Sequence, residues 1–184
     1  MKVLVWVIIA LIVLIILWFL STYNNLVKLR NRMKDQWAQI DVQLKRRADL
    51  IPNLVETVKG YAKHENKTLE DVIKARNSFV NAKTDEEEMS LSGELTKAVG
   101  RLFALTESYP ELKADQNFMS LQNDLRDSED KISTMRQFYN DTVLSYNNKV
   151  EMIPSNIVAK FGGFKKGTFF ETTGVDREVP KVSF

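Results

Sequence analysis

The feature that most constrains this chain is an unbroken run of 18 apolar residues, VLVWVIIALIVLIILWFL, from Val3 to Leu20. As a helix, the run would measure about 27 Å at about 1.5 Å per residue, close to the roughly 30 Å hydrocarbon core of a bilayer. Trp6 and Trp18 lie near its two ends, where indole rings favour the headgroup boundary. The apolar core of a cleaved signal peptide is shorter, about 7–15 residues. We therefore predict an uncleaved, single-pass membrane anchor over residues 1–21.

Basic residues flank the run unequally. Only Lys2 precedes it, whereas Lys28, Arg30, Arg32 and Lys34 follow within 14 residues. Because cytoplasmic flanks of membrane helices carry an excess of Lys and Arg, the domain that follows the anchor is predicted to lie in the cytoplasm.

Beyond the run, apolar residues recur with helical spacing almost throughout. Two series of sevens form one stripe: Leu26, Met33 and Ile40, then Trp37, Leu44 and Ile51. No Gly or Pro separates the stripe from the apolar run, so one helix is predicted to connect them. The pattern predicts an all-α protein, in which an N-terminal transmembrane helix continues into an antiparallel bundle of about four long helices over residues 22–153.

Local signals place the helix ends. Asp49 is a favourable N-cap residue, and Pro52, three residues later, is tolerated in the first turn of a helix. Together they predict a break or kink near residues 50–52. A second helix would run from Pro52 to about residue 83, loosened around residues 63–66. Thr84 and Glu87 have the spacing of a capping box that opens a third helix, which stops before Pro110.

The fourth helix, from about residue 115 to 152, is the most regular. Its apolar and aromatic residues recur at intervals of seven: Phe118, Leu125, Ile132, Tyr139 and Tyr146. This spacing is typical of a coiled coil or of an antiparallel bundle.

The tail, residues 154–184, is richer in Gly and Phe. Four aromatic side chains fall within ten residues: Phe161, Phe164, Phe169 and Phe170. We expect mostly irregular structure, with a short helix at Asn156–Phe161 and disorder from Thr172 onward. Two interpretations of the aromatic cluster stay open. It packs onto the end of the bundle, or it forms an exposed contact for lipid or for a partner.

Composition excludes several kinds of chemistry. The chain has no Cys and one His, His64, which excludes thiol nucleophiles, CxxC metal knuckles and HExxH zinc sites. A surface histidine is the simplest interpretation of His64. The formal net charge of +2 does not predict binding to nucleic acid. We expect no cofactor and no enzymatic activity.

Polar residues on or near the helical stripes are the candidate binding residues: Asp41, Arg46, Arg47, Asn53, Glu56, Tyr139, Asn140, Tyr146 and Asn147. The two Tyr-Asn pairs are seven residues apart, so they face the same way. Buried polar groups need partners, which predicts an interhelical hydrogen-bond network that fixes register. The alternative is a groove for a peptide, a helix or a small ligand. The triplet Lys45–Arg47, taken by itself, is typical of a solvated face with snorkelling stems.

Four segments carry a family resemblance. The most specific motif is DVQLKRRADLIPNLVETVKGYA, within Tyr23–Glu65. The other segments are ESYPELKADQNFMSLQNDL at Glu107–Leu125, MRQFYNDTVLSYNNKVEMIPSNIVA at Met135–Ala159 and FGGFKKGTFFE at Phe161–Glu171. In these segments the chain resembles the LemA family of bacterial membrane-anchored helical proteins, over nearly all of its length from the anchor to Glu171.

The resemblance implies a short N-terminal anchor and a bundle of about four helices at the bacterial cytoplasmic membrane. It implies no established enzymatic activity and supplies no catalytic residues. Members of the family are associated with membrane-bound proteases in bacterial gene neighbourhoods, and one branch belongs to magnetosome formation.

These observations favour a membrane-tethered scaffold or adaptor. It would contact membrane lipid and bind other membrane proteins, a membrane protease among them, or a second copy of itself. The alternative is a ligand-sensing or signal-transducing module that uses the polar seam. A hydrolytic accessory activity would have His64 as its general base, and it is the least supported of the three.

Overall fold

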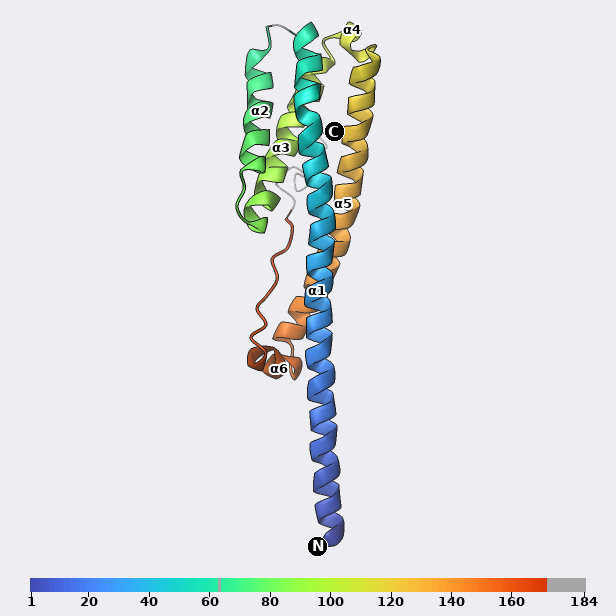
Figure 1. Cartoon of the computed structure of the whole chain (residues 1–184), viewed down its shortest axis with the longest axis vertical. Coiled ribbons are helices and arrows are strands. Elements are labelled where there is room, and N and C mark those ends of the chain that lie inside the picture. The colour runs from blue at the N-terminus through green and yellow to red at the C-terminus, as the bar shows by residue number, and fades with distance from the viewer. Residues whose placement is uncertain (63, 172–184) are drawn as a thin grey trace, which may run out of the picture. The chain divides into compact units, whose positions relative to one another are not determined.

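A computed structural model describes residues 1–62 and 64–171. Within these residues the chain forms six helices and no strand (Figure 1), with these bounds: α1 (Lys2–Tyr61), α2 (Asn66–Val80), α3 (Asp85–Thr106), α4 (Pro110–Lys113), α5 (Gln116–Glu151) and α6 (Ser155–Phe161). The expected all-α architecture, with a long apolar N-terminal helix that leads into a helical bundle, is confirmed. The disorder expected from Thr172 onward falls outside the described residues.

The first third of α1 exposes its apolar side chains. Val3 is 77% exposed, Trp6 70%, Leu20 51% and Trp18 39%. Of the helices described, α1 alone is long and apolar enough to cross a membrane, and its most apolar stretch contains no buried residue. Contact with water costs about 25 cal/mol per Å² of apolar surface, so a continuous exposed stretch of this kind is a candidate for contact with lipid.

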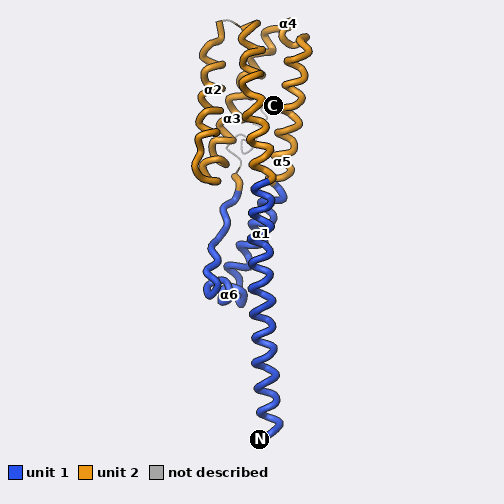
Figure 2. Tube along the Cα trace, viewed as in Figure 1, with its two compact units in different colours: residues 1–38, 137–169 blue, residues 39–136, 170–184 orange. Residues whose placement is uncertain are grey.

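The described residues divide into two compact units (Figure 2). Unit 1 comprises residues 1–38 and 137–169, and unit 2 comprises residues 39–136 with the chain from Phe170 onward. Helices α1 and α5 therefore each contribute residues to both units.

Unit 2 is a four-helix bundle built from the end of α1, α2, α3 and the start of α5. Its core consists of apolar side chains at helical spacing, including Leu44, Ile51, Leu54, Val58, Val72, Leu95, Leu102, Phe118, Leu125 and Ile132. Thr84 caps α3 as predicted, since the Glu87 N–H donates to Thr84 Oγ1 at 3.2 Å. The Glu87 carboxylate differs from the capping box in that it accepts the N–H of Lys83, the residue before the N-cap, at 2.8 Å.

Helix α5 begins with a second cap. The Phe118 N–H donates to Asp115 Oδ1 at 2.9 Å, and the Tyr61 hydroxyl donates to Asp115 Oδ2 at 3.0 Å. Both hydrogen bonds hold the pKa of Asp115 below its ordinary value, and the bond from the Phe118 N–H has the larger effect. The cap also connects the end of α1 to the start of α5.

Helix α1 continues through Pro52, so the break expected near residues 50–52, with a second helix starting at Pro52, is wrong. Helix α1 instead ends at Tyr61, and α2 begins at Asn66. Proline has no N–H to donate to the carbonyl of Ala48, four residues earlier. Arg76 of α2 donates its Nε–H to that carbonyl at 3.3 Å. A side chain of the neighbouring helix therefore satisfies the backbone group that the proline leaves free.

Unit 1 packs α6 and the chain that follows it against α1 and α5. Its core contains Leu26, Tyr146, Val158, Ala159 and Phe164. The short helix expected at Asn156–Phe161 is confirmed, since α6 covers Ser155–Phe161.

Helix α6 ends in a Schellman motif. The Phe164 N–H donates to the Ala159 carbonyl at 3.0 Å, and the Gly163 N–H donates to the Lys160 carbonyl at 3.2 Å. Gly163 has a φ of 65°, the left-handed conformation that such a turn requires and that favours glycine. The turn leaves Phe164 in the core of unit 1.

The pairing of Arg76 with the Ala48 carbonyl predicts a specific coupling. Arg76→Met should lower the free energy of unfolding by about 1–2 kcal/mol, because it leaves a buried carbonyl without a partner. In a Pro52→Ala background the restored backbone N–H can bond the Ala48 carbonyl, so the cost of Arg76→Met should fall by about 1 kcal/mol. Denaturant unfolding of the four proteins, followed by circular dichroism, measures this cycle. Strictly additive effects would contradict the account.

Candidate functional site

Arg47 is the most buried charged side chain described in unit 2. Its residue is 3% exposed, and it reaches from α1 into the space between α3 and α5. Position 47 continues the inward 3–4 spacing of Leu44 and Ile51, which explains the burial. The interpretation of residues 45–47 as a wholly solvated face is therefore wrong for Arg47.

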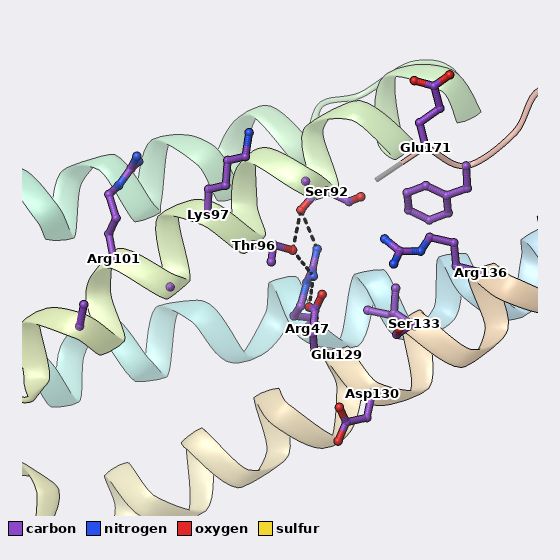
Figure 3. Close-up of a pocket in the computed structure, with 15 residues that line it drawn as sticks. Arg47, Ser92, Thr96, Lys97, Arg101, Glu129, Asp130, Ser133, Arg136 and Glu171 are labelled. Atoms are coloured by element: carbon purple, nitrogen blue, oxygen red, sulfur yellow. Dashed lines mark hydrogen bonds and ion pairs between the residues drawn. The ribbon is translucent and has the colours of Figure 1, made fainter. Parts of the chain in front are cut away.

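Three groups surround the Arg47 guanidinium (Figure 3). Nη1 donates to Thr96 Oγ1 at 2.8 Å and forms an ion pair with Glu129 of α5. Nη2 donates to the Ser92 carbonyl at 3.0 Å, and the Thr96 hydroxyl donates to the same carbonyl at 3.1 Å. An arginine keeps its charge when buried, so it needs a carboxylate and polar acceptors around it. This cluster joins α1, α3 and α5 through polar contacts.

A cavity of about 730 Å³ adjoins the cluster, and its lining includes Ser92, Thr96, Glu129, Ser133 and Arg136. Arg136 points from α5 toward Arg47, whereas Lys97 and Arg101 point away from it (Figure 3). The Arg136 guanidinium lies 5.8 Å from the centre of the Phe170 ring, within cation–π range. Within the described residues, Arg136 takes part in no ion pair.

Asp41 and Glu88 form a second polar group in unit 2. Lys45 Nζ donates to Asp41 Oδ2 at 2.7 Å. Burial raises the pKa of Glu88 above its ordinary value, and the charge of Asp41 raises it further. The candidate residue Asp41 is therefore tied to a lysine on its own helix and to a carboxyl group of α3.

In unit 1, two of the predicted α5 residues hold the Gly- and Phe-containing tail. Asn147 makes a reciprocal pair with Gly167, because its Nδ2 donates to the Gly167 carbonyl at 3.0 Å and its Oδ1 accepts the Gly167 N–H at 2.8 Å. The Tyr139 hydroxyl donates to the Thr168 carbonyl at 3.0 Å. These side chains give the extended segment the backbone partners that it lacks in the absence of a sheet.

The other predicted residues have separate surroundings. Tyr146 is buried in the core of unit 1, and Asn140 is half-buried. Arg46 lies 3.8 Å from Asp124 in an exposed ion pair. Asn53 and Glu56 are exposed, and Glu56 pairs with Lys59 at 3.5 Å on the same helix. The buried members of the predicted seam therefore divide between the two units, with Arg47 in unit 2 and Tyr139, Tyr146 and Asn147 in unit 1.

The four tail aromatics also separate. Phe164 and Phe170 are buried, at 7% and 4% exposed, whereas Phe161 is 85% exposed and Phe169 is 39% exposed. Phe164 packs edge-on against Tyr23 and lies under the guanidinium of Arg30, 5.1 Å from its ring centre.

Sequence reasoning missed Ser92, Thr96, Glu129 and Arg136. The signal available was weak, because Ser92 and Thr96 are small polar residues one turn apart on the otherwise apolar face of α3. His64 is exposed. Within residues 1–62 and 64–171, no group of three or more His, Asp or Glu side chains is placed to hold a metal ion.

Comparison with known proteins decides the family. A family model described as the LemA family matches residues 36–184, most of the chain. The chain belongs to the LemA family. The matched region includes the Arg47 cluster, the residues that line its cavity and the tail segment held by Asn147.

Individual relatives are distant in sequence. The chain is 24% identical to Protein LemA of Metamycoplasma hominis over 160 residues, which cover 86% of this chain and 73% of that protein. It is 25% identical to Magnetosome protein MamQ 2 of Paramagnetospirillum magneticum over 186 aligned positions, which cover 87% of this chain and 68% of that protein. Magnetosome protein MamQ of Magnetospirillum gryphiswaldense is 24% identical, with coverage of 82% and 65%.

The burial of Arg47 predicts unequal roles for two ion pairs that join α1 to α5 in this LemA-family chain. Glu129→Ala should lower the free energy of unfolding by about 2 kcal/mol, because it leaves a buried guanidinium without its carboxylate. Asp124→Ala removes the exposed partner of Arg46 and should cost less than about 0.5 kcal/mol. Denaturant unfolding of both variants measures the difference, and equal costs would refute the role given to Arg47.

Proposed function

We propose that this LemA-family protein is a non-enzymatic scaffold or adaptor. The segment Val3–Leu20 would anchor it in the bacterial cytoplasmic membrane, and its helices would bind protein partners or a second copy. The observation that carries this proposal is the continuity of α1, whose exposed apolar stretch and buried bundle stripe belong to one uninterrupted helix. A bundle built on such a helix is tethered to the membrane by its own backbone.

The expected orientation places the domain beyond the anchor in the cytoplasm. Its support is the set of basic residues that follow the apolar run, including Lys28, Arg32 and Lys34, all exposed. Partners would then be cytosolic proteins, the cytoplasmic parts of membrane proteins such as a membrane protease, or a second copy.

Exposed apolar side chains away from the anchor supply contact points for partners. Phe138 of α5 is 59% exposed, and Val42 of α1 is 61% exposed. Aromatic side chains are enriched in the energetic centres of protein interfaces, which makes Phe138 the first position to test. Two of the relatives are named magnetosome proteins. That name describes those proteins, and the proposal for this chain does not depend on it.

A ligand-sensing role is the second proposal, and the cavity beside Arg47 favours it. Its volume of about 730 Å³ lies in the range of small-molecule sites. The Arg136 guanidinium points into this cavity and supplies a positive charge. The space beside Gly100, on the cavity wall, is open, because a Cβ built there would have no atom within 4 Å. A small organic anion would fit this chemistry.

Photocrosslinking in cells tests the scaffold proposal. Phe138→p-benzoylphenylalanine in the full chain should give discrete adducts, and adducts of twice 21.2 kDa would identify self-association. Lys67→p-benzoylphenylalanine, at an exposed polar position of α2, serves as the matched control and should give few. If Phe138 and Val42 variants crosslink no more than the Lys67 variant, the scaffold proposal fails at these surfaces.

A further inference from the structure

Helix α6 carries its apolar residues on two opposite faces. Val158 and Ala159 are buried in the core of unit 1, whereas Ile157 is 60% exposed and Phe161 is 85% exposed. Ile157 and Phe161 are one turn apart and therefore share a face. Ile153, in the turn that precedes α6, is 82% exposed. We call these three exposed side chains, Ile153, Ile157 and Phe161, the α6 apolar face.

This face is continuous with the end of the apolar run of α1. The Phe161 and Phe19 rings are in edge-on contact, with centroids 6.2 Å apart and planes at 84°. Ile153 and Pro154 line the same cleft of about 400 Å³ as Trp18 and Thr22. Within unit 1, α6 therefore lies beside α1 at residues 18–22 (Figure 1).

The length of the run sets the depth of these residues in a bilayer. From Val3 to Leu20 the helix measures about 27 Å, slightly less than the roughly 30 Å hydrocarbon core. If Val3 lies at one boundary of that core, Trp18 and Phe19 lie at the other. Side chains in contact with Phe19 then lie at the same boundary, where the bilayer changes from acyl chains to headgroups.

Basic side chains flank the α6 apolar face. Lys160 and Lys165 are exposed, and neither takes part in an ion pair with another residue that the structure describes. Lys166, next to them, pairs with Glu151. A short apolar face beside these lysines matches the boundary region of a bilayer. Apolar side chains can enter the acyl region there, and ammonium groups can reach the anionic phosphates of the headgroups.

We propose that the α6 apolar face is a second membrane-contact surface. It enters the leaflet that holds the Leu20 end of the α1 run, and Lys160 and Lys165 contact anionic headgroups there. The Gly162–Gly163 turn supports this arrangement, because it directs Phe161 outward and Phe164 into the core. The proposal rests on the membrane anchor of the proposed function.

Depth measurement in reconstituted full chain tests the proposal. The chain has no Cys, so Ile157→Cys introduces a single thiol for an environment-sensitive nitrobenzoxadiazole label. In vesicles of phosphatidylcholine and phosphatidylglycerol, its emission should be blue-shifted. Lipids with a shallow spin label should quench it several-fold more than lipids with a deep one. Lys67→Cys is the matched control on α2, with emission typical of water and little quenching.

Further variants make each outcome decisive. Leu14→Cys, in the middle of the apolar run, should be quenched best by the deep label, and its failure would overturn the anchor itself. If the label at Leu14→Cys is quenched by lipid but the label at Ile157→Cys behaves like that at Lys67→Cys, the α6 proposal is overturned. The membrane anchor then remains supported. A blue shift at Ile157 without lipid quenching would show that protein covers the face, which also overturns it. Lys160→Gln with Lys165→Gln should reduce quenching at Ile157 in the anionic vesicles.

Discussion

The continuity of α1 is the constraint on which the rest of the structure depends. One helix carries an exposed apolar stretch at its start and a buried apolar stripe farther along, so its backbone must stay hydrogen-bonded between them. Pro52 is the position at which the helix is weakest, because proline has no N–H to donate to the Ala48 carbonyl. The Arg76 side chain replaces that donor, so α2 completes the hydrogen bonding of α1 as well as packing beside α3.

Buried polar contacts give the bundle a register that apolar packing alone would leave loose. Arg47 of α1 meets groups of both α3 and α5, and a shift of either helix by one turn, about 5.4 Å, would separate the charge from its partners. In unit 1, Asn147 and Tyr139 have a similar role toward the tail. The Arg47 network also borders a cavity, so the same residues carry the interhelical contacts and the proposed ligand site.

Patterns local in sequence predicted most of the fold. The apolar run, the heptads, the Thr84 cap and the short helix before Phe161 depend on neighbouring residues, so spacing was sufficient to find them. The continuity through Pro52 was missed, because the donor that rescues the Ala48 carbonyl comes from residue 76. Likewise, spacing placed Arg47 on or near an apolar stripe, but it could not predict the ion-pair partner of the buried guanidinium. That partner, Glu129, is 82 residues away in the sequence. Long-range pairings of this kind leave little trace in a single sequence.

The most direct test of a continuous membrane-to-bundle helix is a spin-label accessibility scan along α1. Single-cysteine variants from residue 3 to residue 61, the end of α1, in the full chain reconstituted in lipid bilayers, report contact with oxygen and with a water-soluble nickel reagent. The account predicts high oxygen and low nickel accessibility over residues 3–20. Beyond them, a helical period without interruption should reach its minima at buried positions such as Leu26, Ile40, Leu44 and Ile51. Nickel accessibility within residues 3–20, or loss of the period between residues 20 and 26 or at Pro52, would contradict it.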